Sequence, residues 1–145
     1  MIMLLGSSNN RIDGKGRLVM PAKFRSEIGE TVYCTLSRNH SLAVYSMDEW
    51  KPYYQKIQAL PSTEEALKLK RFLLSNAEKL PIDGQGRILI PESLRKYAGL
   101  VDQVVVNGAG DHLEIWNSEN WSAYNVENLE NFDEYAEEVG AKYGL

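Results

Sequence analysis

A motif that occurs twice limits the fold of this chain more than any other feature of its sequence. Residues 12–29 read IDGKGRLVMPAKFRSEIG and residues 82–99 read IDGQGRILIPESLRKYAG, so the two segments are identical at eight of eighteen positions. With one inserted residue the similarity continues to Trp50 and Trp121. Solenoids normally need at least ~3 repeats to bury a continuous core. We therefore expect two tandem units that pack against each other as an internal pseudo-dimer.

Each copy of the motif predicts a tight turn between two short strands. An Asp-Gly pair followed by a second glycine is typical of a β-hairpin, and we expect Gly14 and Gly84 to adopt the positive φ that such a turn needs. The aspartate before each of them can accept hydrogen bonds from amides of the turn. Six residues are thus assigned a structural role in the turns: Asp13, Gly14, Gly16, Asp83, Gly84 and Gly86.

The same succession of elements is expected after each turn. Pro21 and Pro91 suit the first turn of a short helix, and Gly29 and Gly99 suit the position after its end. The single cysteine, Cys34, lies in an apolar run, so we expect it to be buried in a strand and free of any internal disulfide. Four apolar or alternating runs are predicted to be strands: 31–36, 41–46, 103–108 and 112–117.

Longer helices are expected behind these strands. Ser46 with Glu49 and Ser62 with Glu65 have the spacing of a capping box, and Pro52 is tolerable only in the first turn of its helix. The residues that could cap the equivalent helix of the second unit are Asn117 and Ser118. The buried face of the helix between the units is expected to consist of Leu69, Phe72, Leu73 and Ala77.

The end of the chain is acidic and amphipathic. Residues 127–138 carry six acidic residues and no basic one. Apolar residues recur there at intervals of three and four, as in an amphipathic helix: Leu129, Phe132, Ala136, Val139 and Tyr143. Because no Gly/Ser-rich linker separates the units, we predict one α+β body with a pseudo-dimeric, barrel-like core and flanking helices. The expected boundaries are 3–60 for the first unit, 61–77 for a connecting helix, 78–125 for the second unit and 126–145 for the acidic helix.

The charge is distributed unevenly along the chain, although the formal net charge is only −4. Up to Arg71 there are eleven basic residues against seven acidic ones, or +4, and from Phe72 onward five against thirteen, or −8. Residues 11–25 alone contain five basic residues and one acid, whereas residues 81–95 contain two of each. Such asymmetry indicates a polyanionic partner or an acidic tail, with solvated faces of mixed sign as the alternative.

Several classes of protein are disfavoured. The apolar start MIMLL has no basic flank and no later run is long enough to span a bilayer, so we expect a cytoplasmic protein without a membrane partner. His40 and His112 lack further ligands at metal spacing and are expected to be solvated. No phosphate loop, dinucleotide motif or catalytic set is recognisable. We therefore expect neither an enzyme nor a metal, cofactor or small-molecule substrate.

The first turn is the candidate site. A two-stranded ribbon fits the major groove of DNA, where an arginine can make a two-pronged contact to guanine. Arg17 is predicted to make that contact from a freely protruding finger, while Lys15 at the tip and Lys23 behind it suit phosphates. Arg11 adds to the same positive cluster. The alternative for Arg17 is an ion pair with Asp13, and Arg25 and Arg95 are expected to pin turn to helix through a carboxylate.

At these residues the chain resembles a known family. The segments DGKGRLVMPAKFR and DGQGRILIPESLR, with RFLLSNA before the second and GAGDHLEIWNSENW after it, look like the MraZ family of the AbrB-like swapped-hairpin superfamily. The resemblance runs from Met3 to about Trp121. It implies two AbrB-like units with interleaved strands. It also implies a nucleoid-associated transcriptional regulator, usually a repressor, that assembles into a ring and binds short direct repeats of double-stranded DNA upstream of its own division and cell-wall operon.

The family pattern falls on particular residues. The DNA-contacting arginine matches Arg17, its basic neighbour matches Lys15, and the second motif contributes Arg87. Gln85 replaces the basic residue in the second motif, so that turn is less basic and could face a neighbouring subunit instead. A different class of function stays open: a protein-interaction scaffold or antitoxin-like module that uses the hairpins and the acidic C-terminal helix. An RNA-binding role is less favoured, because no aromatic residue lies in the basic cluster to stack on bases.

Overall fold

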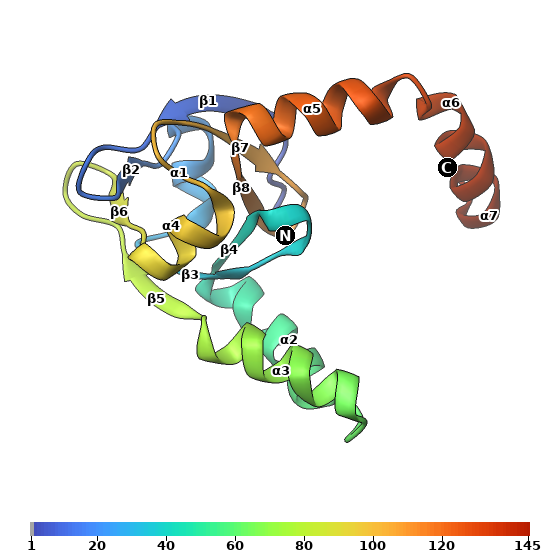
Figure 1. Ribbon diagram of the computed structural model, residues 1–145, viewed down its shortest axis with the longest axis horizontal. Coiled ribbons are helices and arrows are strands. Elements are labelled where there is room, and N and C mark those ends of the chain that lie inside the picture. Colours follow the sequence, from blue (N-terminus) through green and yellow to red (C-terminus); the bar gives the residue numbers. More distant parts are fainter. Residues whose placement is uncertain (1) are drawn as a thin grey trace.

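The computed structural model describes residues 2–145 and shows an α+β fold built on a six-stranded antiparallel sheet (Figure 1). The order of strands in that sheet is β1-β7-β8-β4-β3-β5, and β2 and β6 form a separate two-stranded ribbon. The strands are β1 (Ser7–Arg11), β2 (Arg17–Val19), β3 (Thr31–Leu36), β4 (Leu42–Ser46), β5 (Glu78–Pro81), β6 (Arg87–Leu89), β7 (Gln103–Gly108) and β8 (Leu113–Asn117). The four strands predicted behind the turns are therefore present, as β3, β4, β7 and β8.

Helices follow the strands in both halves of the chain. The helices are α1 (Ala22–Ile28), a short 3-10 turn η1 (Arg38–His40), α2 (Met47–Gln58), α3 (Glu64–Ser75), α4 (Glu92–Ala98), α5 (Ser118–Leu129), α6 (Phe132–Tyr135), a π-helical turn η2 (Ala136–Gly140) and α7 (Ala141–Tyr143). Pro21 and Pro91 directly precede α1 and α4, and Gly29 and Gly99 directly follow them, as expected. None of the helices in residues 2–145 is long and apolar enough to cross a membrane.

The two halves exchange strands. β1 of the first half pairs with β7 of the second, from Ser7 opposite Asn107 to Arg11 opposite Gln103. β5 of the second half pairs with β3 of the first, and β2 pairs with β6. The interleaving implied by the family resemblance is thus confirmed. Each predicted Asp-Gly turn is closed locally, because the Asp13 amide donates to the Arg17 carbonyl and the Asp83 amide donates to the Arg87 carbonyl, both at 2.9 Å. Beyond the turns, however, the flanking strands pair with the other half of the chain and not with each other.

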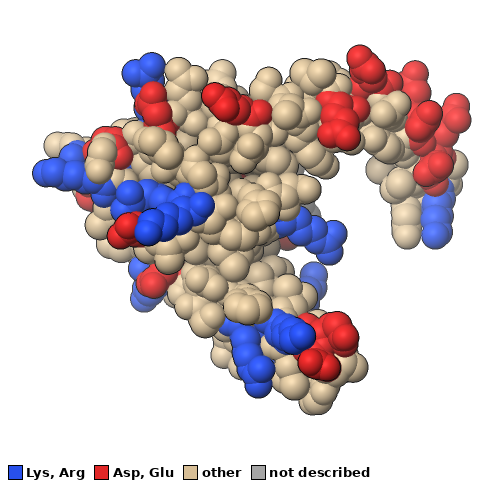
Figure 2. Space-filling view, viewed as in Figure 1, with Lys and Arg blue, Asp and Glu red and all other residues tan. Residues whose placement is uncertain are grey.

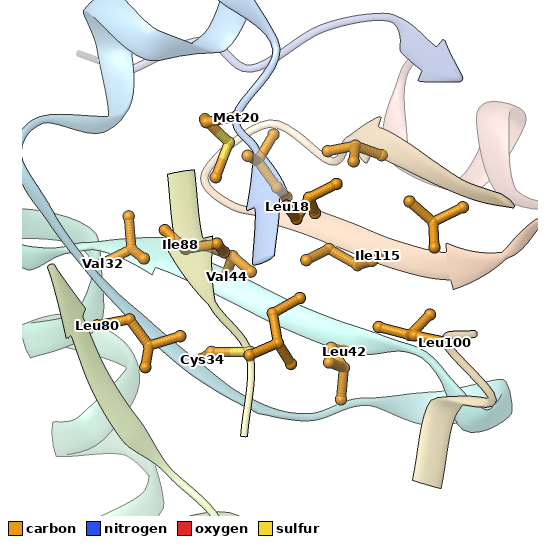
Figure 3. Packing of buried hydrophobic residues seen from close by; sticks show 14 of the residues in the cluster. Leu18, Met20, Val32, Cys34, Leu42, Val44, Leu80, Ile88, Leu100 and Ile115 are labelled. Atoms are coloured by element: carbon orange, nitrogen blue, oxygen red, sulfur yellow. The ribbon is translucent and has the colours of Figure 1, made fainter. Parts of the chain in front are cut away.

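Residues from both halves share one core. Leu18 of β2 and Ile88 of β6 are fully buried side by side, and the inner faces of β3, β4, β7 and β8 surround them (Figure 3). Cys34 is buried in β3 as expected, and burial raises the pKa of its thiol to about 12. The inner sides of both units thus meet in one large cluster, and a second, smaller cluster around Tyr45 and Trp50 lies on the outer face of the sheet in the first half.

In the first half, α2 and α3 cover the outer face of the sheet. Trp50 of α2 is only 9% exposed and packs on Tyr45 of β4 and Tyr33 of β3. The Thr35 hydroxyl donates a buried hydrogen bond of 2.6 Å to the carbonyl of Leu73 in α3. This bond fastens α3 to the sheet.

Several details of these helices differ from the predictions. Thr63, not Ser62, caps α3, since its hydroxyl accepts from the amide of Ala66. Pro52 is the sixth residue of α2 and lies beyond the first turn. Leu73 is buried as predicted, but Leu69 and Phe72 are 51% and 59% exposed, because α3 turns its Leu73 and Leu74 side toward the sheet.

The second half ends in a long helical extension. Asn117 caps α5 by accepting from the amide of Asn120, which agrees with one of the two predicted caps. The helical path changes direction after Leu129 and continues as α6, η2 and α7, away from the sheet (Figure 1). The apolar residues of this extension are exposed. The extension is therefore amphipathic in sequence, but its apolar side chains are not buried in the fold of the single chain.

Candidate nucleic-acid interface

The aspartate of each motif organises the turn that follows it. Asp13 Oδ1 accepts hydrogen bonds of 2.9 Å from the amides of Lys15 and Arg17, and the amide of Gly16 donates to the Asp13 carbonyl at 3.0 Å. Asp83 repeats the pattern with the amides of Gln85 and Arg87, at 2.8 and 2.9 Å. Each aspartate side chain accepts from the amides two and four residues after it, and this explains why both copies begin with aspartate.

These hydrogen bonds favour the charged form of the carboxylates. The bond from the Arg17 amide lowers the pKa of Asp13 from its ordinary value of 3.8 to about 2, and the Arg17 guanidinium adds to the effect. The pKa of Asp83 is lowered for the same reason by the amide and guanidinium of Arg87. Both carboxylates are therefore negatively charged at neutral pH.

Positive φ falls on the second glycine of each motif. Gly16 has φ of 86° and Gly86 has φ of 77°, whereas Gly14 and Gly84, for which it was expected, do not have positive φ. The second glycine is also tightly packed: a β-carbon on Gly16 would lie 2.6 Å from Nε of Arg95. Gly16 and Gly86 therefore satisfy two constraints at once, a left-handed backbone and a side chain pressed against it.

The arginine pressed against each glycine comes from the other half of the chain. Arg95 of α4 lies over Gly16, and Arg25 of α1 lies over Gly86. Neither uses a carboxylate, as had been expected: Arg95 Nε donates to the carbonyl of Ile90 at 2.8 Å, and Arg25 Nη2 donates to the carbonyl of Met20 at 2.9 Å. Each arginine is thus bonded to its own half and packs against the backbone of the other half. This double contact explains why an arginine stands at a fixed offset behind each motif.

Arg17 is not free of carboxylates. Its Nε lies 2.7 Å from Asp13 Oδ2, and Arg87 pairs with Asp83 in the same way at 2.9 Å. The expectation of an unpaired arginine on a freely protruding finger is therefore wrong, and the ion pair considered as the alternative is present. The pair engages Nε and leaves the terminal guanidinium nitrogens outside it. An exposed pair of this kind contributes only about 0–1 kcal/mol, so it holds the guanidinium in place rather than stabilising the fold.

Both arginines lie on the same face of the β2–β6 ribbon. Arg17 is opposite Leu89 and Arg87 is opposite Val19, while Leu18 and Ile88 between them point into the core. Alternation along the strands puts Arg17, Val19, Arg87 and Leu89 together on the outer side, where Val19 and Leu89 are 45% and 55% exposed. We call this four-residue face the arginine ribbon.

Sequence reasoning missed the arginine ribbon as a unit. It treated Arg17 and Arg87 as belonging to two separate hairpins, and it did not single out Val19 or Leu89. The alternation in RLVM and RILI was the available signal, since it marks one apolar residue of each run as inward and its neighbours as outward. The pairing of β2 with β6 was the missing information.

The other basic residues predicted for the site, Lys15, Arg11 and Lys23, do not belong to the arginine ribbon. Lys15 is exposed at the tip of the first turn, next to Arg17. Arg11 is 72% exposed at the end of β1 and lies 3.7 Å from Asp102. Lys23 is held at the start of β1, where its Nζ donates to the carbonyl of Ser7. Basic side chains gather at the end of the molecule that carries β2, β6 and α4, with a few acids among them (Figures 1 and 2).

The histidines do not form a metal centre. Among residues 2–145 no group of three or more His, Cys, Asp or Glu side chains could hold a metal ion. His112 is only 21% exposed, lies 2.6 Å from Asp111 and stacks on Tyr45, and His40 stacks on Tyr97. His40 is exposed, as expected, although it stacks on Tyr97, whereas the partly buried His112 departs from the expectation of a solvated side chain.

Comparison with known proteins agrees with this geometry. The family model described as "MraZ protein, putative antitoxin-like" matches residues 3–72 and again residues 73–140. The chain is 44% identical to the transcriptional regulator MraZ of Leuconostoc citreum, with 93% of this chain and 95% of the relative covered. It is 40% identical to that of Oenococcus oeni, with 94% and 96% covered, and 42% identical to that of Alkaliphilus metalliredigens, with 95% and 99% covered. Two matches of the family model, one on each half of an interleaved fold with paired Asp-Gly-x-Gly-Arg turns, show that this chain belongs to the MraZ family.

Proposed function

We propose that this protein is a transcriptional regulator that binds double-stranded DNA through the arginine ribbon and the adjacent Lys15. The observation that carries the proposal is the presence of two arginines, each oriented by an aspartate, on one exposed face of a two-stranded ribbon. A ribbon of this width fits the major groove, and an arginine held in place there can donate two hydrogen bonds to a guanine. Relatives named as transcriptional regulators over nearly their whole length support the same function and do not suggest an enzyme.

The finer features of the proposal come from the family resemblance. The protein acts mainly as a repressor of its own division and cell-wall operon in the nucleoid. Its targets are short direct repeats, which a ring-like assembly of chains contacts through several ribbons at once. One ribbon per chain presents a small surface, so linking several of them raises the overall affinity without any new contact.

Within the ribbon the residues have different tasks. Arg17 and Arg87 read bases, Lys15 contacts a phosphate beside them, and Arg11 and Lys23 add positive charge at the flank. Val19 and Leu89 lie between the arginines and can contact a thymine methyl group. The acidic C-terminal extension lies at the opposite end of the molecule, which favours one orientation on the polyanion (Figure 2).

Binding to the DNA upstream of the protein's own reading frame tests the proposal. Arg17→Ala should weaken binding to that DNA by about tenfold to a hundredfold, since one such arginine contact is worth ~1–3 kcal/mol. Binding to unrelated DNA should change much less. Lys15→Ala should weaken binding to both kinds of DNA, because a phosphate contact carries no sequence information.

Two controls make the result interpretable. Lys142→Ala removes a basic residue from α7, far from the ribbon in the chain and in Figure 1, and should leave binding unchanged. Circular dichroism and thermal melting should show that Arg17→Ala is folded, because its ion pair is exposed. Unchanged affinity of the Arg17→Ala variant for the upstream DNA would contradict the assignment, and Arg87→Ala decides whether the second arginine contributes.

A further inference from the structure

The backbone of the arginine ribbon has approximate two-fold symmetry. Leu18 lies opposite Ile88 at its centre, and a half-turn about this point exchanges Arg17 with Arg87. The strands are antiparallel and each begins directly after its own turn, so the two turns lie at opposite ends of the ribbon. The backbone hydrogen bonds within the two turns are also equivalent. A DNA duplex therefore meets nearly the same backbone shape from either end of the ribbon.

The tips of the two turns break this symmetry. Lys15 stands at the tip of the first turn and Gln85 at the tip of the second, and both residues are exposed. The other unlike pair on the exposed face, Val19 and Leu89, is aliphatic on both sides. On the ribbon and its turns, the chemistry that meets DNA therefore differs between the two ends mainly at one pair of positions.

The other basic residues near the first turn are engaged in the fold. Arg11 lies 3.7 Å from Asp102, which offsets its charge. Lys23 Nζ donates to the carbonyl of Ser7. Neither side chain is as free as that of Lys15, so the tips carry the difference between the two ends.

The turn itself sets no requirement on the side chain at either tip. The Gln85 amide donates to Asp83 Oδ1 at 2.8 Å, as the Lys15 amide donates to Asp13 Oδ1 at 2.9 Å, and any residue with an amide can do this. A lysine ammonium on its long, flexible stem suits a phosphate. A glutamine side chain has no charge but offers one acceptor and two donors. This pattern matches the N6 amino group and the N7 acceptor that adenine presents in the major groove.

Gln85 is close enough to the ribbon to read a base. It stands two residues before Arg87, and two residues of extended chain span at most ~7 Å. Neighbouring base pairs are ~3.4 Å apart, so the glutamine can reach the base pair beside the one that the arginine contacts. The Arg87 guanidinium is held 2.9 Å from Asp83, in the same turn as Gln85. A base bound by Arg87 therefore also fixes where Gln85 meets the groove.

We propose that Gln85 reads an adenine beside the base contacted by Arg87, while Lys15 binds a phosphate at the other end, so that the ribbon binds its DNA in one direction. This inference rests on the proposed function and adds to it a base-reading residue and a polarity. The second turn contributes specificity with little charge, and the first contributes affinity. Each chain then presents the same end of its ribbon to the same end of a binding site.

Single-atom changes in the DNA test the glutamine contact. The probe is the shortest duplex from upstream of the reading frame that binds the protein, with one adenine at a time replaced by an analogue that has carbon in place of N7. For the wild type, one such replacement should weaken binding by about tenfold or more, as expected for a two-pronged contact. Gln85→Ala should bind the unmodified duplex more weakly by a similar factor and lose nothing further at that position. The matched control is Gln55→Ala in α2, an exposed glutamine whose loss should leave the sensitivity intact.

Salt dependence distinguishes the two tips. Lys15→Gln removes one phosphate contact and should reduce the slope of log affinity against log salt concentration by ~0.9. Gln85→Ala should leave that slope unchanged, because no charge is lost. Both variants keep the backbone amides that the aspartates accept from, so their thermal melting should match the wild type.

Exchanging the tips tests the polarity. Val101 is 82% exposed and lines the same hollow as Asp13, beside the first turn. A DNA-cleaving iron chelate attached to Val101→Cys therefore marks the end of the site that faces the first turn, while Cys34 is buried and protected from the reagent. Without further changes the labelled protein should cut at one end of the site. The exchange Lys15→Gln/Gln85→Lys keeps composition and charge, and should move the cut to the opposite end.

Three results would overturn this inference while leaving the proposed function intact. The first is equal cutting at both ends, or cutting at the same end before and after the exchange of tips. The second is equal sensitivity of the wild type and Gln85→Ala to every adenine analogue. The third is a Gln85→Ala variant with altered assembly and unaltered adenine sensitivity, which would assign the second turn to a contact between proteins. If instead the wild type fails to bind the upstream DNA, or Arg17→Ala binds it with full affinity, the proposed function itself fails.

Discussion

Replacing Gly16 by alanine should destabilise the protein, whereas replacing Gly14 should not. The two glycines lie two residues apart in the same turn, yet only Gly16 is buried, only Gly16 has positive φ, and only there would a β-carbon meet another side chain. Nothing lies within 4 Å of a β-carbon placed on Gly14. The two substitutions therefore add the same methyl group at nearly the same place in the chain, and they differ in the backbone conformation and in the neighbours of the glycine.

The size of the effect follows from two costs. An alanine in the left-handed region costs ~1–2 kcal/mol relative to glycine. The new β-carbon would also displace the Arg95 guanidinium, which lies 2.6 Å away, and disturb its 2.8 Å bond to the Ile90 carbonyl. A bond of this partly exposed kind is worth about 1 kcal/mol. The lower entropy of the unfolded chain returns ~0.4–1 kcal/mol. The net loss is about 2 kcal/mol, or a fall in Tm of roughly 4–8 °C for a chain of this size.

A double-mutant cycle separates the two costs. In an Arg95→Ala background the steric part disappears, so Gly16→Ala should cost about 1 kcal/mol less than it does in the wild type. Chemical denaturation of the four proteins gives the coupling free energy directly. If Gly14→Ala and Gly16→Ala lowered stability equally, or if the Arg95→Ala background changed nothing, the account of why this arginine stands at a fixed offset would be refuted.

Three further predictions concern stability. Because the pKa of Asp13 is lowered to about 2, its charged form stabilises the folded turn at neutral pH. This stabilisation is lost as the pH falls from about 4 to about 2. The difference in Tm between the wild type and Asp13→Asn should therefore be constant above about pH 4 and shrink below it. Thr35→Val leaves the Leu73 carbonyl without its partner and should cost ~1–3 kcal/mol in denaturant unfolding, while the exposed Thr63→Val serves as a control that loses only a helix cap, ~1 kcal/mol. Ile88→Ala opens a cavity between the halves and should cost ~2–5 kcal/mol, and a loss below 1 kcal/mol would contradict the shared core.

The local pattern of the sequence predicted most of the elements. Strands such as 31–36 and 103–108 are β-branched and apolar, and a buried antiparallel strand needs little else. The short helices between Pro21 and Gly29 and between Pro91 and Gly99 could be placed because both of their ends carry residues with a defined conformational preference. The repeat itself predicted that two equivalent units would pack together.

The sequence could not show which strand pairs with which. The Asp-Gly turn has the same local chemistry whether its flanks pair with each other or with the other half, so the predicted hairpin was replaced by the β1–β7 and β2–β6 pairs. This long-range choice also decides the site, because it brings Arg87 next to Arg17. The exposure of Leu69 and Phe72 was missed for a related reason: an apolar residue on a helix can serve a contact outside the chain as well as its own core.

The exchange of strands has a consequence for how the chain must fold. Ser7 meets Asn107 across one hundred residues, so the amino-terminal strand has no lasting place until almost the entire polypeptide has been made. A loop of that length closes slowly, and contacts between such distant segments are associated with slow folding. Fragments cut near residue 72 would each expose the strand that the other requires and would recover structure only when mixed. The interlaced halves therefore gain or lose their structure together, as one cooperative unit.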